Sequence, residues 1–197
     1  MKPKTIRLAT AEDAAGILQV YAPYITDTTI TFECKIPSEE EFRSRVKSTL
    51  QKYPWLVCET DGHIIGYAYA AAFNEREAYN WSVTCSVYVD PRYHRQKIGQ
   101  ALYTALFELL KLQGFYNVYA IVTVPNVKSE SLHEAFGFET IGVFARIGFK
   151  FDHWLDIKWY GLKLNQQPDS PQPPKPIGEI AATDQFRQVL KKAEQMI

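Results

Sequence analysis

The sequence predicts a mixed α/β domain, on the basis of its length and two alternating patterns. The chain has 197 residues, of which 46% are hydrophobic, and this is enough to bury one sizeable core. Stretches rich in β-branched residues, typical of strands, alternate with stretches in which apolar residues recur at the spacing of amphipathic helices. Elements that interleave in this way favour a sheet with helices packed against it.

Two capping boxes mark the starts of the first helices. Thr10 pairs with Asp13, and Ser38 pairs with Glu41. After each box, apolar residues recur every three or four positions and form one face of the helix. In the first helix these residues are Ala14, Ile17, Leu18, Tyr21 and Ile25, and in the second they are Phe42, Val46 and Leu50.

The remaining elements are delimited by turn residues and by glycines. Asp61–Gly62 predicts a hairpin turn, Gly114 the end of a third helix, and Gly137 the end of a short fourth one at 129–136. The buried face of the third helix comprises Ile98, Leu102, Ala105, Leu106 and Leu109. Strands are expected at 6–8, 55–59, 64–71, 81–89 and 117–124, with two more before residue 164.

The last part of the chain differs in composition. Residues 165–176 are rich in proline, so residues 165–182 are interpreted as an extended linker after a domain that spans 1–164. Residues 183–197 are expected to form a terminal amphipathic helix, which we interpret as a packing or dimer-contact helix outside the active site. Its apolar side comprises Phe186, Val189, Leu190 and Ala193.

Composition argues against several classes of partner. The 22 basic and 22 acidic residues balance, so neither nucleic acid nor a membrane is expected as a partner. We find no apolar run long enough to cross a bilayer and no signal-peptide pattern. Cys34, Cys58 and Cys85 are odd in number and lack C-x-x-C spacing, so neither a disulfide framework nor a metal site is predicted. These features favour a cytoplasmic protein.

Residues 81–99, W-S-V-T-C-S-V-Y-V-D-P-R-Y-H-R-Q-K-I-G, lead from a strand through a basic turn into a helix. The first amides of a helix lack intrahelical partners and attract anions. The basic residues of the turn are Arg92, His94, Arg95 and Lys97. This stretch alone is compatible with a phosphate site, although a solvated turn explains it more simply.

A second motif changes that balance. Residues 124–138 hold the pattern N-x-x-S-x-x-L-H-x-x-x-G-F, formed by Asn126, Ser129, Leu132, His133, Gly137 and Phe138. The two stretches together resemble motifs A and B of the GNAT superfamily of N-acetyltransferases, and more closely its phosphinothricin (glufosinate) acetyltransferase branch. Further matching segments are Y-P-W-L-V at 53–57, A-Y-N-W at 78–81 and G-F-K-F-D-H-W-L-D at 148–156, so the resemblance covers nearly all of residues 6–164.

The resemblance implies both a fold and an activity. It implies a mixed, mostly antiparallel sheet with flanking helices, whose fourth and fifth strands splay apart around the pantetheine arm of acetyl-CoA. It also implies a homodimeric enzyme that acetylates a small amino-acid-like amine of the phosphinothricin or methionine sulfoximine type. The alternatives are another amine, such as a polyamine, an antibiotic or a protein terminus, or a catalytically weak acyl-CoA-binding module.

Coenzyme-binding positions carry over from the resemblance. The backbone of Val87, Tyr88 and Val89 is expected to pair with the pantetheine amides, and the Val87 N–H, where the fourth strand bulges away from its neighbour, to stabilise the oxyanion. Asn126 and Ser129 are expected beside the same arm. The phosphate-binding amides are those of Arg95, Gln96, Lys97, Ile98, Gly99 and Gln100. The chain departs from the family pattern at Lys97, where the first glycine is usual.

Catalytic positions also depart from the family. His133 stands where the superfamily usually has the tyrosine that protonates the thiolate; it is either this acid or a packed histidine. Thr84 stands where the branch has a glutamate base, so it could at most hold a water that relays the proton. Cys85 is interpreted as a core residue. The amine pocket is expected at Phe32, Arg76 and Tyr79, with Arg76 either binding an acidic group or simply exposed.

Overall fold

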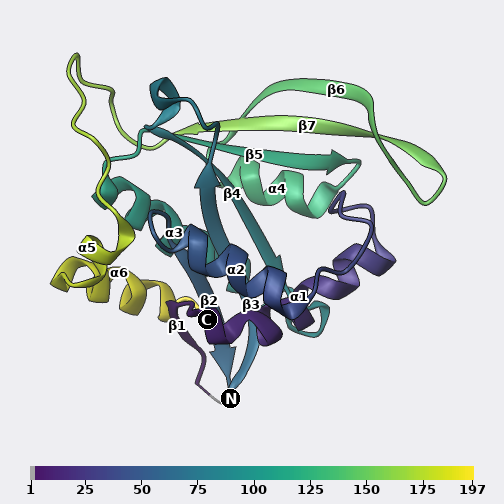
Figure 1. Ribbon diagram of the computed structural model, residues 1–197, viewed down its shortest axis with the longest axis horizontal. Helices are drawn as coiled ribbons and strands as arrows, with labels where there is room; N and C mark the ends of the chain where they lie inside the picture. Colours follow the sequence, from purple (N-terminus) through teal and green to yellow (C-terminus); the bar gives the residue numbers. More distant parts are fainter. Residues whose placement is uncertain (1–2) are drawn as a thin grey trace.

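The computed structural model describes residues 3–197, which contain one sheet with strand order β1-β2-β3-β4-β5-β7-β6 (Figure 1). Within these residues the strands are β1 (Thr5–Leu8), β2 (Trp55–Thr60), β3 (His63–Ala72), β4 (Ser82–Val89), β5 (Asn117–Val124), β6 (Glu139–Lys150) and β7 (His153–Lys163). All neighbouring strands are antiparallel except β4 and β5. The predicted mixed, mostly antiparallel sheet is confirmed.

The helices begin close to where the capping residues place them. They are α1 (Ala14–Asp27), α2 (Glu39–Thr49), α3 (Ile98–Gln113), α4 (Val127–Ala135), α5 (Ile177–Ala181) and α6 (Asp184–Glu194). Both predicted capping boxes are formed, although the one at Thr10 opens a single 3-10 turn before α1. Helix α4 begins at Val127, two residues earlier than expected, because Asn126 caps it.

Helices cover both faces of the sheet (Figure 1). Alternate residues of a strand point to opposite faces. On one face, α1 and α2 pack on Trp55, Val57 and Tyr67, and on the other, α3 packs on Leu56 and Ala68. Two hydrophobic cores, one on each face, therefore hold the central strands in place.

The strands β4 and β5 separate after three residue pairs. They pair from Ser82 to Thr84 only, whereas β4 stays paired with β3 to Val89 without a register shift. Strand β5 meanwhile pairs with β7 along its whole length. The predicted splay is therefore confirmed, and it arises because β4 leaves β5, with no bulge against β3.

The C-terminal segment packs against the rest of the domain. The stretch interpreted as a linker contains α5, whose Ile177 and Ile180 are buried with α3 in one core. The Gln113 side chain donates hydrogen bonds to the carbonyl oxygens of Lys52 and Lys175, at 2.8 and 2.7 Å. Helix α6 is capped by Thr183 and buries Phe186 in the same core. Residues 177–197 thus extend the core, whereas residues 165–176 before them form no helix or strand and have no buried residue.

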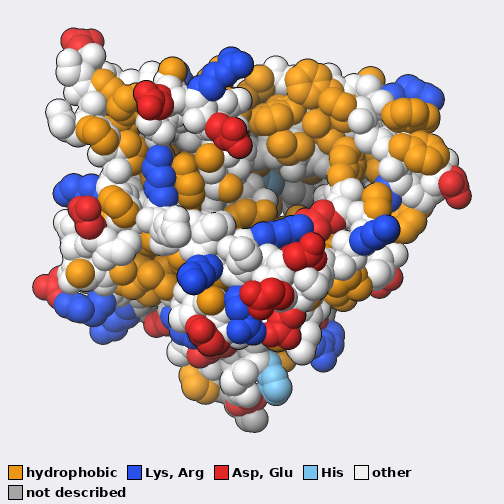
Figure 2. Space-filling model, viewed as in Figure 1, with side chains coloured by type: hydrophobic (Ala, Val, Ile, Leu, Met, Phe, Trp, Pro, Cys, Tyr) orange, Lys and Arg blue, Asp and Glu red, His pale blue; other side chains and the backbone are white. Residues whose placement is uncertain are grey.

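Apolar side chains are exposed along β6 and the turn into β7. Figure 2 shows them gathered over these two strands. The residues are Ile141, Val143, Phe144, Ile147, Phe149, Phe151 and Trp154, each about half exposed. Strand β6 is also the last strand of the sheet, so its outer edge carries unpaired main-chain groups. A contiguous apolar surface on a sheet edge is typical of an interaction surface.

Candidate active site

A cavity occupies the wedge between β4 and β5. Its walls come from both strands, from α3 and α4, and from the segment between α1 and α2. The lining residues are Ile30, Cys85, Ser86, Val87, Tyr88, Tyr103, Ile121, Val122, Thr123, Asn126, Ser129 and His133. The structure therefore brings together the predicted residues of β4 and of α4.

The main-chain N–H and C=O groups of β4 point alternately toward β3 and toward this cavity. Asp90 N–H donates to the Ile65 carbonyl at 2.9 Å, which fixes the phase of the β3–β4 ladder. Tyr88 therefore bonds to β3, and Val87 and Val89 direct their N–H and C=O groups toward the side that β5 has left. The Val89 carbonyl accepts the Tyr24 hydroxyl at 2.5 Å. Of the three residues predicted to pair with the pantetheine amides, Tyr88 therefore cannot do so through its backbone, which is bonded to β3. The backbone N–H and C=O of Val87 face the wedge.

The start of α3 adopts the conformation that glycine favours, without a glycine. Arg95 and Lys97 lie in the left-handed region, with φ of 62° and 60°. A Cβ on Gly99 would meet its nearest atoms only at 3.8 Å, so neither crowding nor a positive φ requires glycine there. The amides of Ile98, Gly99 and Gln100 open the helix and lack intrahelical partners. The anion-binding geometry is present, and Lys97 adopts the strained turn itself.

The other predicted basic residues are held by neighbours. The Arg92 guanidinium is paired with Asp90, which accepts bonds from its side chain and backbone. The imidazole of His94 lies 3.0 Å from the Val89 carbonyl. Arg95, Gln96 and Lys97 are exposed at the mouth of the turn. The available positive charge is therefore that of Arg95 and Lys97.

Helix α4 is fixed by the polar residues of the second motif. Asn126 Oδ1 accepts the Ser129 N–H at 3.2 Å, as an N-cap does. His133 Nδ1 lies 2.7 Å from the Ser129 carbonyl oxygen. Because that oxygen can only accept, Nδ1 carries the hydrogen. Asn126 and Ser129 thus orient the imidazole.

A chain of polar groups runs through the buried side of the wedge. His133 Nε2 lies 3.2 Å from the hydroxyl of Tyr103 on α3, and this hydroxyl lies 3.6 Å from Cys85 Sγ. In neutral His133, whose Nδ1 is the donor, Nε2 accepts the Tyr103 proton. His133 is 3% exposed and stacks on Tyr160 at a centroid distance of 5.6 Å. The imidazole is buried, and its wedge-facing partner is Tyr103.

Burial disfavours the charged forms of all three groups. Desolvation lowers the pKa of His133, and the hydrogen bond to Ser129 offsets this in part. Burial raises the pKa of the Tyr103 hydroxyl well above its usual value and that of the Cys85 thiol to about 12. Cys85 is therefore a protonated core thiol, as expected, and a poor nucleophile. Tyr103 was missed from the sequence because its position fits the apolar face of α3.

Thr84 marks the point at which β4 and β5 part. The unbroken β3 register places Thr84 on the same face as Ser86 and Tyr88, as predicted from strand alternation. Tyr88 lies among the rings of Tyr21 and Tyr24, so this face is the one covered by α1. Among the described residues that line the wedge, none is Asp or Glu. A carboxylate base is not built into its walls.

The predicted amine-pocket residues come from two different segments. Phe32, which is 39% exposed, belongs to the segment that connects α1 and α2, and its ring lies against Gly148 of β6. Tyr79, equally exposed, lies in the β3–β4 connection with its ring 5.4 Å from that of Phe73. Arg76 is exposed in the same connection, and its backbone N–H donates to Asn74.

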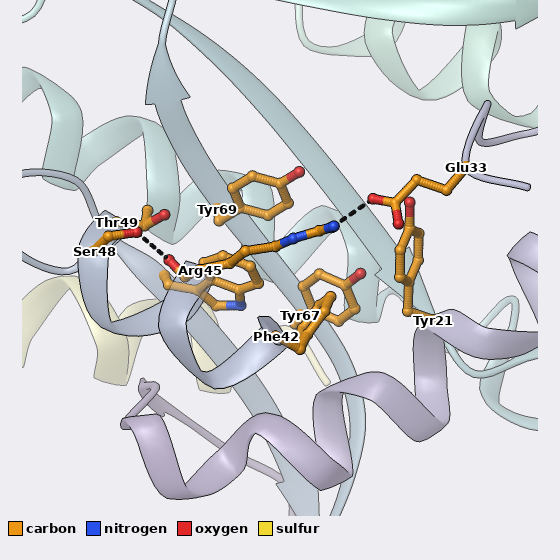
Figure 3. A pocket seen from close by; sticks show the side chains of 9 residues that line it. Tyr21, Glu33, Phe42, Arg45, Ser48, Thr49, Tyr67 and Tyr69 are labelled. Carbon is orange, nitrogen blue, oxygen red and sulfur yellow. Dashed lines mark hydrogen bonds and ion pairs between the residues drawn. The ribbon is translucent and has the colours of Figure 1, made fainter. Parts of the chain in front are cut away.

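A second cavity, of about 210 Å³, lies between α1, α2 and the sheet. Figure 3 shows Arg45 reaching past the rings of Tyr67 and Tyr69 to Glu33. The Arg45–Glu33 ion pair measures 2.6 Å and joins α2 to the segment after α1. Tyr69 is paired with Ser86 across β3 and β4, so one residue pair separates this cavity from the wedge. This cavity lined by aromatic residues was not predicted from the sequence.

The described residues contain neither a membrane-spanning helix nor a cluster of metal ligands. Within residues 3–197, no helix is long and apolar enough to cross a membrane. Over the same residues, no group of three or more His, Cys, Asp or Glu side chains could hold a metal ion.

Comparison with known proteins identifies similar chains. A family model described as "Acetyltransferase (GNAT) domain" matches residues 6–159. Phosphinothricin N-acetyltransferase of Streptomyces viridochromogenes is 35% identical over 91% of this chain and 97% of its own length. L-methionine sulfoximine/L-methionine sulfone acetyltransferase of Pseudomonas aeruginosa is 31% identical over 85% of this chain and 98% of its own length. Among solved structures, a GNAT superfamily phosphinothricin acetyltransferase from Sinorhizobium meliloti in complex with AcCoA has a TM-score of 0.81 and 31% sequence identity. The match covers 88% of this chain and 98% of that chain.

Strain at the start of α3 can be tested by comparing two variants of Lys97. Lys97→Gly should be about 1 kcal/mol more stable than Lys97→Ala, because glycine adopts positive φ without a Cβ clash. Both variants lose the same charge, so their difference isolates the backbone conformation. Urea unfolding with an unchanged m-value measures it. Equal midpoints would show that position 97 carries no such strain.

Proposed function

The chain belongs to the GNAT acetyltransferase family, and from this premise we propose that it transfers the acetyl group of acetyl-CoA to the amino group of a small amino-acid-like substrate. Relatives named for phosphinothricin and for methionine sulfoximine align over most of its length, so we propose an acceptor of that type. The observation that carries the proposal is the wedge between β4 and β5, which is bordered by Val87 and the buried His133.

We propose how the pantetheine arm, the thioester and the pyrophosphate of acetyl-CoA bind around the wedge. The main chain of Val87 would pair with the pantetheine arm as an added strand does, and its N–H would stabilise the oxyanion. The opening amides of α3, with Arg95 and Lys97 nearby, would bind the pyrophosphate. Asn126 and Ser129 would border the arm from α4.

We propose that the departing thiolate takes its proton through Tyr103. Protonated His133 would pass the Nε2 proton to the Tyr103 oxygen while the Tyr103 proton moves to sulfur, and so Tyr103 stays neutral. An imidazolium is a stronger acid than a thiol, and the lowered pKa of His133 widens this difference, which favours transfer toward sulfur. The neutral, Nδ1-protonated form described above is then the state after transfer, and solvent restores the proton.

The amine must lose a proton without a carboxylate in the wedge walls. Thr84, where the branch has glutamate, would hold the water that accepts the proton. A hydroxyl cannot ionise near neutral pH, so it does not replace a base. This feature favours one second candidate function, a catalytically weak acyl-CoA-binding module.

An amine panel tests the activity. Thiol release from acetyl-CoA is expected with phosphinothricin or methionine sulfoximine, and kcat/KM should rise with pH until the amine is largely neutral. Polyamines, aminoglycosides and N-terminal peptides serve as comparison acceptors. If acetyl-CoA binds by calorimetry but no amine accelerates thiol release, the binding-module alternative holds and the enzyme proposal is wrong.

The proton relay makes Tyr103 and His133 act as a unit. Tyr103→Phe and His133→Ala should each lower kcat by roughly 10²- to 10⁴-fold with little change in acetyl-CoA affinity, and the double variant should lose no more than either alone. Tyr160→Phe is the matched control, since Tyr160 stacks on His133 but its hydroxyl points to Glu130. Equal kcat values for Tyr103→Phe and Tyr160→Phe would exclude the relay.

We also propose that the protein is a cytoplasmic homodimer. The apolar surface of β6 and the turn into β7 supports the dimer, because a second copy could bury it. Cys34, Cys58 and Cys85 are free, which supports a reducing compartment.

Charge on this surface should separate the protomers. We expect wild type at twice the 22.6 kDa chain mass and Ile141→Lys shifted toward the monomer, because an unpaired ammonium would be desolvated in the interface. Val127→Lys is the matched control, an exposed apolar residue on α4 outside the surface. Light scattering at several concentrations measures the mass, and a monomeric wild type would refute the dimer.

A further inference from the structure

The segment between α1 and α2, residues 28–38, lies against β6 through an aromatic contact. A Cβ placed on Gly148 would lie 2.1 Å from Phe32 Cε2 and within 2.7 Å of two further ring atoms. The φ of Gly148 is not in the left-handed region, so the backbone itself would accept alanine. What requires glycine at position 148 is therefore the ring of Phe32.

A buried cation makes a second contact between the same two elements. Lys150, at the end of β6, is 5% exposed, and its Nζ donates to the Thr31 carbonyl at 2.8 Å. Thr31 is buried as well, and its hydroxyl lies 2.6 Å from that of Tyr21 on α1. Burying an ammonium against a neutral carbonyl is costly in free energy, and burial lowers the pKa of Lys150 accordingly. Such a contact holds only where the surroundings fix both partners.

The end of the β6–β7 hairpin is itself well fixed. Its register shifts between Phe144 and Gly148, where Arg146 has a φ of 53° and donates its N–H to Asp156 at 2.7 Å. The turn at Phe151 and Asp152 has positive φ at both residues, as a type I′ hairpin requires. These features orient Gly148 and Lys150 toward residues 28–38.

We propose that Gly148 and Lys150 are positioning residues that hold residues 28–38 against the amine side of the wedge. Ile30 of this segment lines the wedge. Phe32 does not line it, but the family resemblance predicts that Phe32 forms a wall of the amine pocket. Moving the segment would therefore displace the acceptor more than the coenzyme, whose proposed contacts lie on β4, α3 and α4. The proposal rests on the proposed acetyltransferase function and names what sets the position of its acceptor wall.

The first experiment moves Phe32 without removing it. Gly148→Ala should raise the KM for the amine on the order of tenfold or more, because a small displacement of a positioning group costs that much. Acetyl-CoA affinity should stay unchanged. Gly142→Ala is the matched control, since it lies on the same strand with no atom within 4 Å of the added Cβ. In a Phe32→Ala background, Gly148→Ala should add no further effect, because the clash is gone.

The second experiment reads the segment directly. In Gly148→Ala and in Lys150→Met, amide hydrogen exchange at residues 28–38 should be faster than in wild type, whereas Gly142→Ala and Lys163→Met, which alters an exposed lysine of β7, should match wild type. Unchanged exchange in both test variants would overturn the proposal. If wild type acetylates no amine, the proposed function fails, while the exchange data still decide whether the contacts hold the segment.

Discussion

The wedge exists because β4 and β5 form no ladder pairs beyond Thr84. Inside a sheet, every main-chain amide and carbonyl has a partner on the next strand. Val87 lies beyond the last residue of β4 that pairs with β5, so its main-chain N–H and C=O on that side have no partner strand among the described residues. An extended, polar ligand could bond to both groups. Residues of α3 and α4 also line the cavity that this divergence leaves. One missing stretch of ladder therefore creates the cleft and leaves main-chain groups of β4 facing it.

Features with local causes could be predicted from the sequence. The box at Ser38 and Glu41, the Asp61–Gly62 turn and the Gly114 helix end each depend on a few neighbouring residues, and all three are present. The splay of β4 was accessible only through resemblance, since nothing within residues 82–89 encodes where β5 will be. Helix α5 was missed because the prolines before it predict an extended chain, whereas its burial depends on α3.

The candidate site divides in the same way. His133 and Asn126 follow from the spacing of one motif, and the structure places both on α4 or at its start. Tyr103 lies on a different helix, and its apolar neighbours hide the role of its hydroxyl until α4 is in place. Its partner His133 is buried and disfavoured as a cation, so any proton on the imidazole is readily given up. Burial is thus compatible with both roles considered for His133, a packed residue and the proposed acid.

Among the contacts that hold residues 28–38, three differ in how strongly they can act. The Arg45–Glu33 pair is partly exposed on both sides, and such pairs contribute about 0–1 kcal/mol because water competes for both charges. Lys150 is buried against Thr31, where no water can replace the bond, and the ring of Phe32 fills a space that only glycine leaves open. Contacts of this kind cannot shift gradually, since interiors are close-packed. The position of residues 28–38 is therefore set in part from β6, a strand that contributes no residue to the lining of the wedge.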